Sequence, residues 1–360
     1  MRTSPTAAAT TDALEQWRRG TYPGTRPFGW YHLVDSDAVP PGAVERVAAL
    51  GKELVVFRTE EGALSVLDAH CPHLGAHLGV GGKVVGDVIR CPFHGLRFRV
   101  DGSCAGGSSG GSSPRIRARA WPARELYGMV FVYHGPLGPR AEVPYVPAYW
   151  PHLASDRFVP RGRHTPRDVR MHLLEFAENS VDLQHFGMLH RKLRLPWTNV
   201  RVPWVELCHR VRWELDRERP HVAHFYDDAH LVIAGRDYPA TGAAGHALFV
   251  GPASLVVFTI RLPRAGDVVI FQTHTPIDED EGPLRLRVRF RWWAERTVPR
   301  LLTSYVVGNW ISQWWRDVEV WENKIHVPRP LLTRGDGPLR ELRSWFRQFY
   351  AESTPAARIA

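Results

Sequence analysis

The chain is poor in cysteine and contains no long hydrophobic run. Only four of its 360 residues are cysteine, too few for the disulfide frameworks that stabilise small secreted domains. No stretch approaches the roughly 18 uncharged apolar residues of a transmembrane helix. The first 20 residues also lack the apolar core of a signal peptide. These absences predict a soluble, cytoplasmic protein without a transmembrane segment, in which the first dozen residues are disordered.

A concentrated block of positive charge is missing as well. Lys and Arg number 46 against 37 Asp and Glu, so that the net charge is +9. The arginines are scattered along the chain, which favours a solvated basic surface and argues against a nucleic-acid partner. Such a surface could also attract an acidic protein partner.

Hydrophobic patterning divides the chain into two regions. Short runs rich in Val and Phe, separated by Gly- and Pro-containing turns, extend from about residue 26 to 135 and predict a small antiparallel β-domain. After residue 145, a helix is predicted over 167–193, followed by strands of a larger antiparallel sheet. These strands include 207–217, 253–262 and 267–278. Helical spacing returns over 296–327 and 339–353. The Gly/Ser-rich stretch 105–115 is expected to form a mobile or surface-draped loop.

The fold class is therefore predicted to be α+β, with an all-β domain followed by a large antiparallel sheet covered by helices, as in a helix-grip fold. The predicted divisions are a partly disordered segment 1–27, a β-domain 28–138 and a second domain 139–360.

Two short loops in the β-region hold the candidate ligands of a metal centre. Cys71 and His73 lie in "CPHLG", and Cys91 and His94 lie in "CPFHG", with 17 residues between the two pairs. Thiolate and imidazole ligate zinc and iron-sulfur clusters, and four of them complete a coordination shell.

Two centres fit this ligand set: a zinc ion, or a Rieske 2Fe-2S cluster in which two histidines replace two cysteines on one iron. Zinc fingers usually place two like ligands in one knuckle, whereas each loop here offers a cysteine and then a histidine. Gly75 and Gly95 permit tight loops whose N–H groups can face cluster sulfur. The two stretches resemble the Rieske domain of Rieske non-haem iron oxygenases. Leu96 departs from the tryptophan common in that family but removes no ligand.

A second candidate site lies in "ENSVDLQHFGMLH", residues 178–190. This stretch resembles the family signature Asn-x-x-Asp-x-x-His-x4-His, which implies a mononuclear iron site with His185 and His190 as ligands and Asn179 and Asp182 as catalytic residues. Five positions put the two histidines about 140° apart on a regular α-helix. They can face one iron only if the helix breaks or includes a π-type turn, which Gly187 would allow.

Ferrous centres that activate oxygen typically bind two histidines and one carboxylate on one face. The stretch 313–324, "QWWRDVEVWENK", offers Asp317 and Glu319. Chemistry alone leaves both open. Similarity to the family pattern Asp-x-x-x-Trp-x-Asn-Lys selects Asp317.

The resemblance covers residues 30–350 and is strongest to the cholesterol 7-desaturase and 3-ketosteroid 9α-hydroxylase oxygenase group. It implies a monooxygenase or desaturase with a Rieske 2Fe-2S cluster and mononuclear Fe(II), acting with dioxygen on a large apolar sterol or steroid. Electrons would come from NAD(P)H through a ferredoxin or a flavin-dependent ferredoxin reductase. Asp182 would link an iron-site histidine to a Rieske histidine of the neighbouring subunit, which implies a homotrimer.

Fourteen tryptophans, with Trp310, Trp314, Trp315 and Trp321 near the predicted carboxylate, could form the wall of an apolar cavity. Three alternatives remain: an oxygenase acting on a non-steroid polycyclic or natural-product substrate, a Rieske electron-transfer protein without oxygenase activity, and a zinc-bound interaction module.

Overall fold

A computed structural model of the chain describes residues 11–24, 26–107, 115–140, 142–147, 153, 155–277 and 282–351. The chain divides into two compact units. The first unit comprises Phe28–Pro144 and Thr275–Asp280, and the second comprises Met1–Pro27, Tyr145–His274 and Glu281–Ala360. The predicted disorder of the first dozen residues falls almost wholly outside the described residues, as does most of the Gly/Ser-rich stretch 105–115.

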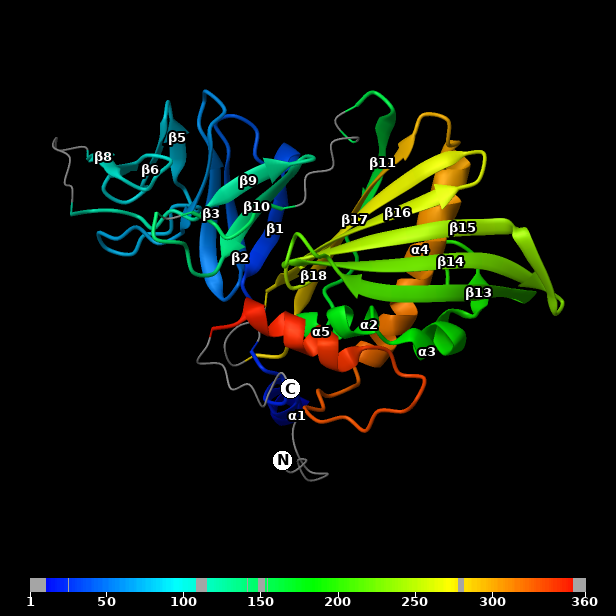
Figure 1. Ribbon diagram of the computed structural model, residues 1–360. Helices are drawn as coiled ribbons and strands as arrows, with labels where there is room; N and C mark the ends of the chain where they lie inside the picture. Colours follow the sequence, from blue (N-terminus) through cyan, green and yellow to red (C-terminus); the bar gives the residue numbers. More distant parts are fainter. Residues whose placement is uncertain are drawn as a thin grey trace. The chain divides into compact units, whose positions relative to one another are not determined.

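The first unit consists of three antiparallel sheets, with strand orders β1-β10-β9, β2-β3-β4 and β5-β6-β7-β8 (Figure 1). Its elements are β1 (Gly29–Asp35), η1 (Ser36–Ala38), β2 (Val44–Ala49), β3 (Lys52–Arg58), β4 (Leu64–Asp68), β5 (Lys83–Val85), β6 (Val88–Arg90), β7 (Arg97–Phe98), β8 (Cys104–Gly106), β9 (Ala123–Leu126) and β10 (Met129–His134). The predicted all-β character of this region is confirmed.

The core of the first unit extends beneath the two cysteine-containing loops. Strand β3 contributes a continuous apolar run, Leu54 to Phe57, that is fully buried. In strand β2, exposed and buried residues alternate toward its end, because one face of the strand is open to solvent. Val55, Phe57 and Phe98 belong to the same hydrophobic cluster as Cys71 and Cys91. The side chains of Cys71 and Cys91 are therefore part of the core, whereas His73 and His94 of the same loops are exposed.

The second unit is built on one eight-stranded antiparallel sheet with the order β11-β18-β17-β16-β15-β14-β13-β12. Its strands are β11 (Phe158–His164), β12 (Lys192–Arg194), β13 (Arg201–Leu215), β14 (Val222–Ile233), β15 (Arg236–Val250), β16 (Leu255–Leu262), β17 (Gly266–Pro276) and β18 (Leu286–Glu295). Consecutive strands from β13 to β18 pair in order, so that hairpin connections suffice. The predicted large antiparallel sheet is confirmed.

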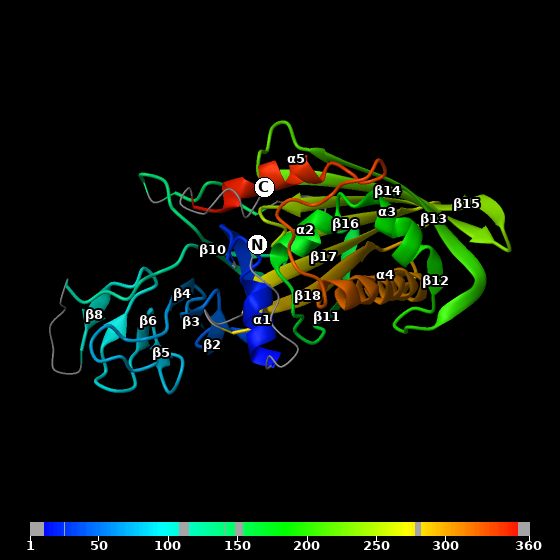
Figure 2. The same ribbon diagram turned by 90° about the horizontal axis from the view of Figure 1, so that it is seen from below.

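Helices cover one face of this sheet, as Figures 1 and 2 show. In the figures these are α2 (Leu173–Asn179), α3 (Leu183–His185), α4 (Arg300–Trp321) and α5 (Leu339–Phe346). The unit also contains α1 (Thr11–Arg19), the π-helical η3 (Phe186–His190) and η4 (Arg347–Phe349). The long α4 packs on the sheet through Trp310, whose ring centroid lies 4.2 Å from that of Phe258, and through Trp314, 5.2 Å from Phe290. Among the described residues no helix has both the length and the apolar character needed to span a bilayer.

The continuous helix predicted over 167–193 is wrong. The chain forms α2, leaves the helix at Ser180, and resumes with α3, where the Asp182 side chain accepts a hydrogen bond from the His185 N–H as the N-cap. Short polar side chains stabilise such helix starts, which explains the break within an otherwise apolar period.

Candidate metal centres

The first candidate centre begins with the loop that carries Cys71 and His73. The Cys71 N–H donates to the Ala76 carbonyl at 2.8 Å, and the Gly75 N–H donates back to the Cys71 carbonyl at 2.9 Å. Gly75 has a φ of +76°. An added Cβ there would meet no atom within 4 Å. The glycine is thus required by its left-handed backbone and not by crowding.

The second loop repeats this geometry around Cys91 and His94. The Cys91 N–H donates to the Leu96 carbonyl at 2.7 Å, the Gly95 N–H donates to the Cys91 carbonyl at 3.2 Å, and Gly95 has a φ of +69°. Two loops of different sequence thus have the same backbone hydrogen bonds, as expected when they hold two halves of one symmetric ligand set.

The two thiols are buried and lie close together. Burial raises the pKa of the Cys71 thiol, and the neighbouring Cys91 raises it further, while backbone N–H groups of His73 and Leu74 that face the sulfur lower it. N–H groups directed at sulfur are a common feature around iron-sulfur clusters.

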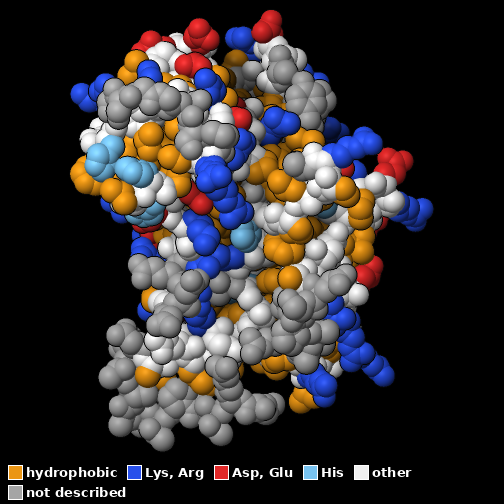
Figure 3. Space-filling model, turned by 90° about the vertical axis from the view of Figure 1, so that its left-hand side faces the viewer, with side chains coloured by type: hydrophobic (Ala, Val, Ile, Leu, Met, Phe, Trp, Pro, Cys, Tyr) orange, Lys and Arg blue, Asp and Glu red, His pale blue; other side chains and the backbone are white. Residues whose placement is uncertain are grey.

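The two histidines, by contrast, face solvent. His73 and His94 are exposed, with ring centroids 5.0 Å apart. Leu74 and Phe93 beside them are 64% and 62% exposed. Figure 3 shows histidine side chains on the surface next to hydrophobic ones, with Lys and Arg close by. Two buried sulfurs and two exposed imidazoles match the donor set of a Rieske cluster, whose two irons differ in their ligands.

A single ion would need a tighter arrangement. Ligand atoms of a tetrahedral zinc site lie within about 4 Å of one another. Two groups of described His, Cys, Asp and Glu residues bring their ligand atoms within 4.8 Å, and the four loop residues form neither of them. The spacing therefore favours the two-iron cluster over zinc. His70 and His77, which lie outside the ligand set, contact Gly75 O and Glu53.

The second candidate centre depends on a π-type turn. His185 ends α3, and His190 ends the π-helical η3. Both side chains are buried, and their ring centroids are 5.0 Å apart. Of the two predicted ways to bring the histidines together, a helix break or a π-type turn, the structure shows a π-type turn between them. The backbone of Gly187 is helical, and a Cβ added there would have no atom within 4 Å. The turn therefore does not require glycine at this position.

Helix α4 supplies the carboxylate. Asp317 is buried, and its Oδ1 lies 3.1 Å from His190 Nε2. The ligand atoms of His185, His190 and Asp317 all lie within 4.8 Å of one another. Glu319 instead is exposed and forms an ion pair with Arg316. The structure thus brings Asp317, and not Glu319, to the two histidines.

Hydrogen bonds orient the three side chains for metal binding. His185 Nδ1 bonds the Asp182 carbonyl, and His190 Nδ1 lies 3.3 Å from Gln313 Oε1, so that both Nε2 atoms are directed toward the inside of the site. Burial lowers the pKa of His185. Burial also opposes protonation of His190, but the Asp317 carboxylate outweighs it and raises the pKa of His190. Two imidazoles and a carboxylate whose ligand atoms all lie within 4.8 Å of one another fit a ferrous ion.

Asn179 and Asp182, the other predicted site residues, surround His185. Asn179 Nδ2 lies 3.1 Å from His185 Nε2. The Asp182 carboxylate is solvent-exposed, although its carbonyl and its Oδ1 both contact the buried His185. Asp182 therefore connects the buried His185 to the protein surface.

A cavity of about 380 Å³ opens beside this centre. Its lining is mostly apolar and comes from α4, η3 and the sheet, and includes Phe176, Leu193, Leu207, Phe225, Ala247, Phe249, Phe258, Ile260, Leu302 and Val306. Of the four tryptophans expected to wall a cavity, Trp310 and Trp314 line it. The expectation is wrong for the other two, because the Arg167 guanidinium lies over Trp315 and Trp321 packs against Phe176.

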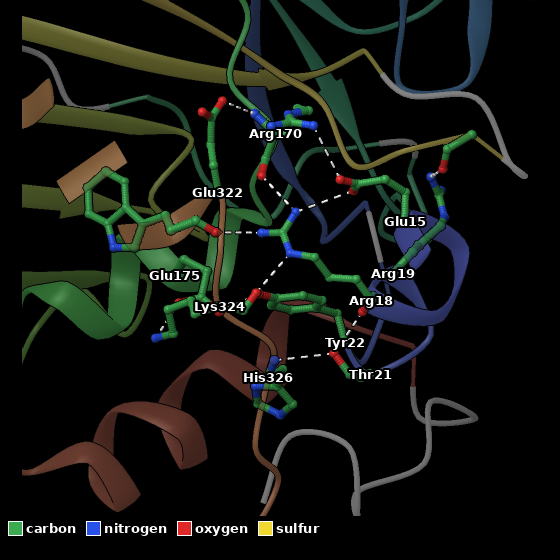
Figure 4. Close-up of polar contacts among 12 residues, drawn as sticks. Glu15, Arg18, Arg19, Thr21, Tyr22, Arg170, Glu175, Glu322, Lys324 and His326 are labelled. Carbon is green, nitrogen blue, oxygen red and sulfur yellow. Dashed lines mark hydrogen bonds and ion pairs between the residues drawn. The ribbon is translucent and has the colours of Figure 1, made fainter. Parts of the chain in front are cut away.

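A buried ionic network supports the iron-site segments, and the sequence did not reveal it (Figure 4). Arg18 of α1 donates to the carbonyl of Trp321, the last residue of α4, at 2.5 Å. It also donates to the carbonyl of Lys324, three residues later, at 2.8 Å. Glu175 of α2 accepts from the Tyr22 hydroxyl at 2.6 Å and pairs with Lys324 at 2.5 Å. The network ties α2, which precedes the histidines, to the end of α4, which carries Asp317. In the sequence, the only sign of this network was Lys324, the last residue of the family pattern Asp-x-x-x-Trp-x-Asn-Lys.

Three other acidic or sulfur-containing residues, Glu178, Cys104 and Cys208, lie outside both centres. Glu178 pairs with Arg343 at 2.8 Å instead of with the histidines. Cys104 and Cys208 are free thiols. Cys208 belongs to the second group of close ligand atoms, with His230 and Asp237, but Asp237 is exposed.

Comparison with known proteins assigns both units. Residues 29–114 match the family described as Rieske [2Fe-2S] domain, and residues 132–350 match the 3-Ketosteroid 9alpha-hydroxylase C-terminal domain. Cholesterol 7-desaturase nvd of Xenopus laevis is 34% identical over 94% of this chain and 74% of its own length. A probable 3-ketosteroid-9-alpha-monooxygenase, oxygenase component, of Rhodococcus rhodochrous is 32% identical over 95% and 85%.

Solved structures share the fold. NdmA of Pseudomonas putida CBB5, a QL mutant with caffeine, superimposes with a TM-score of 0.63 at 16% identity over 95% of each chain. Dicamba monooxygenase bound to dicamba gives a TM-score of 0.56 at 16% identity, over 89% of this chain and 96% of that one. At this identity they establish the architecture alone.

Proposed function

Because the chain belongs to the Rieske oxygenase family that includes cholesterol 7-desaturase and the oxygenase component of 3-ketosteroid 9α-monooxygenase, we propose that it hydroxylates or desaturates a sterol or steroid. The observation that carries this proposal is the position of His185, His190 and Asp317 beside a mostly apolar cavity. A large apolar cavity with few polar groups suits a polycyclic hydrocarbon skeleton.

His185, His190 and Asp317 are the proposed ligands of the ferrous ion, and Cys71, His73, Cys91 and His94 those of the 2Fe-2S cluster. When bound, the ferrous ion supplies dioxygen activation and the cluster supplies electrons. The chain's own groups hold this chemistry in place. The Asp182 carbonyl fixes the His185 ring, Gln313 fixes the His190 ring, and the apolar wall excludes water from the reacting C–H bond.

Electron delivery is proposed to cross between subunits. His73 and His94 are exposed, and so is the Asp182 carboxylate that contacts His185. Groups at the surface of both units are accessible to a second copy of the chain. We therefore assign Asp182 as the link between an iron-site histidine and a Rieske histidine of a neighbouring subunit, within a homotrimer.

The electron source is proposed to be NAD(P)H, acting through a ferredoxin or a flavin-dependent reductase. Two relatives are named as oxygenase components, a name that supports a separate partner supplying electrons. Lys83, Arg90 and Arg97 line a surface hollow next to His94. Positive charge beside an exposed cluster ligand would attract an acidic protein and speed its association. Cytoplasmic location and functional domains 28–138 and 139–360 are part of the same proposal.

The test combines metal analysis with product identification. Purified protein should contain about three irons per chain when both sites are filled. With a surrogate reductase it is offered sterols, 3-ketosteroids and non-steroid polycycles, and products are identified by mass spectrometry. His185→Ala should keep the Rieske absorption spectrum and lose turnover.

Each rival function predicts a different result. Two irons per chain after anaerobic ferrous loading, with no oxygen uptake, would indicate an electron carrier. Colourless protein that contains zinc would indicate an interaction module. Products from non-steroid polycycles only would retain the oxygenase and reject the steroid. Normal turnover by His185→Ala would overturn the iron-site assignment.

A further inference from the structure

The cavity wall contains one histidine–aspartate pair that the iron site does not use. His209 of β13 and Asp227 of β14 both line the cavity, and His209 Nδ1 lies 2.7 Å from Asp227 Oδ2. Their side chains are only 11% and 17% exposed. The β13–β14 register pairs His209 with Ala229, and Val211 with Asp227, so that the two side chains are diagonal neighbours on one face.

Each member of this pair retains one buried atom without a hydrogen-bond partner in the described chain, His209 Nε2 and Asp227 Oδ1. Buried polar atoms are nearly always satisfied in native proteins, so two such atoms on residues that line one cavity call for a ligand or water. Most other polar side chains of the lining have partners. Examples are Ser180 with the Ala177 carbonyl, Thr241 with the Tyr238 carbonyl, Asn309 with the Arg194 carbonyl, and His246 with His224.

One further lining residue, Trp314 of α4, has a buried Nε1 donor without a hydrogen bond. It lies three residues before Asp317 of the proposed iron site, whose Oδ1 pairs with His190 Nε2. The His209–Asp227 pair lies on the sheet instead. Phe186 links the two regions, because its ring centroid lies 5.3 Å from those of both His190 and His209. A substrate in this cavity can therefore reach the iron site and the pair with different parts of its skeleton.

The hydrogen-bonding pattern identifies the substrate group. A carboxylate accepts, so His209 Nδ1 donates to Asp227, and in the tautomer with its proton on Nδ1 the Nε2 atom is an acceptor. Asp227 Oδ1 is also an acceptor. We propose that the His209–Asp227 pair is the specificity-determining subsite for a hydroxyl group of the substrate, and that the enzyme prefers a steroid alcohol to the corresponding ketone. This inference rests on the proposed steroid oxygenation. It adds that the cavity recognises a hydroxyl group of the substrate rather than a carbonyl group.

The test compares two ligands that differ only in that oxygen, cholestanol and cholestan-3-one. Their dissociation constants are measured by anaerobic calorimetry with the iron-loaded protein, so that no turnover occurs. The wild type should bind the alcohol roughly ten- to a hundredfold more tightly, the range expected for one hydrogen bond to a charged acceptor. Asp227→Asn should bring the two constants within about threefold of each other, because its amide can donate to a ketone.

Asp237→Asn is the matched control. Asp237 forms a similar pair with His230 at 2.8 Å, but it is exposed and does not line the cavity. This variant should keep the wild-type preference. His209→Gln provides a second test if Asp227→Asn folds poorly, and it should also reduce the preference.

The possible results distinguish failure of the proposed subsite from failure of the proposed function. Oxygen uptake with both compounds but no preference for the alcohol, or a preference unchanged in Asp227→Asn and His209→Gln, overturns the subsite and leaves the oxygenase intact. Tighter binding of the ketone by the wild type also overturns it. Failure to bind or oxidise either compound overturns both the subsite and the steroid proposal.

Discussion

Replacing Lys324 with Met should destabilise the second unit by leaving the Glu175 carboxylate buried without its cation. The Glu175 side chain is 1% exposed and that of Lys324 39%. Removing one partner of a buried ion pair costs roughly 3–5 kcal/mol. We expect about 3 kcal/mol, because Lys324 is partly solvated and Tyr22 still donates to Glu175. In a unit of this size, this corresponds to a melting temperature lower by roughly 6–12 °C.

The loss of stability caused by Lys324→Met should also be larger at higher pH. Burial raises the pKa of Glu175, and Lys324 counteracts this. Without Lys324 the folded-state pKa rises further above the unfolded value. Stability is then fully present below the unfolded pKa and is lost as pH rises through the folded pKa. The difference from wild type should therefore be smaller near about pH 5 than near about pH 8.

Thermal unfolding of two further variants identifies the cause. Glu175→Gln/Lys324→Met should recover at least half of the loss, since no charge remains buried. Lys192→Met, which breaks the surface pair with Glu206, should leave the melting temperature close to that of the wild type, because exposed ion pairs add little to stability. The reasoning is refuted if the double variant is as unstable as Lys324→Met, or if Lys324→Met behaves like Lys192→Met. Iron content should fall with Lys324→Met while the Rieske spectrum persists, because the network ties α2 to α4.

Other perturbations report on the two metal centres. His190→Ala should lower the iron content from about three to about two per chain and leave the Rieske electron paramagnetic resonance signal unchanged; loss of that signal would contradict separate sites. Asp182→Asn should retain both metals yet slow turnover by roughly ten- to a hundredfold, which stopped-flow reoxidation of the cluster would measure. Gly95→Ala should cost about 1–2 kcal/mol through its positive φ and reduce cluster retention on gel filtration; a cluster as stable as wild type would exclude a strained loop.

Much of this protein could be predicted from sequence because the decisive patterns are local. The four proposed Rieske ligands lie in two short loops, and the two proposed iron-site histidines lie five residues apart, so that family motifs could select them and spacing could predict that a helix break or a π-type turn lies between the histidines. Alternating apolar residues likewise predicted the strands of the large sheet. In each case the residues that share a role are neighbours along the chain, where periodicity and spacing carry information.

The features that sequence did not decide depend on contacts between distant segments. Asp317 and Glu319 are equivalent in chemistry, and only the packing of α4 brings Asp317 to His190 while leaving Glu319 in solvent. Arg18 of the N-terminal segment reaches carbonyls about 300 residues away, and His209 meets Asp227 only through the pairing of β13 with β14. Composition and spacing specify which chemical groups the chain carries. Which of them are buried together follows from the packing of sheet and helices, because burial decides which polar groups must find a partner.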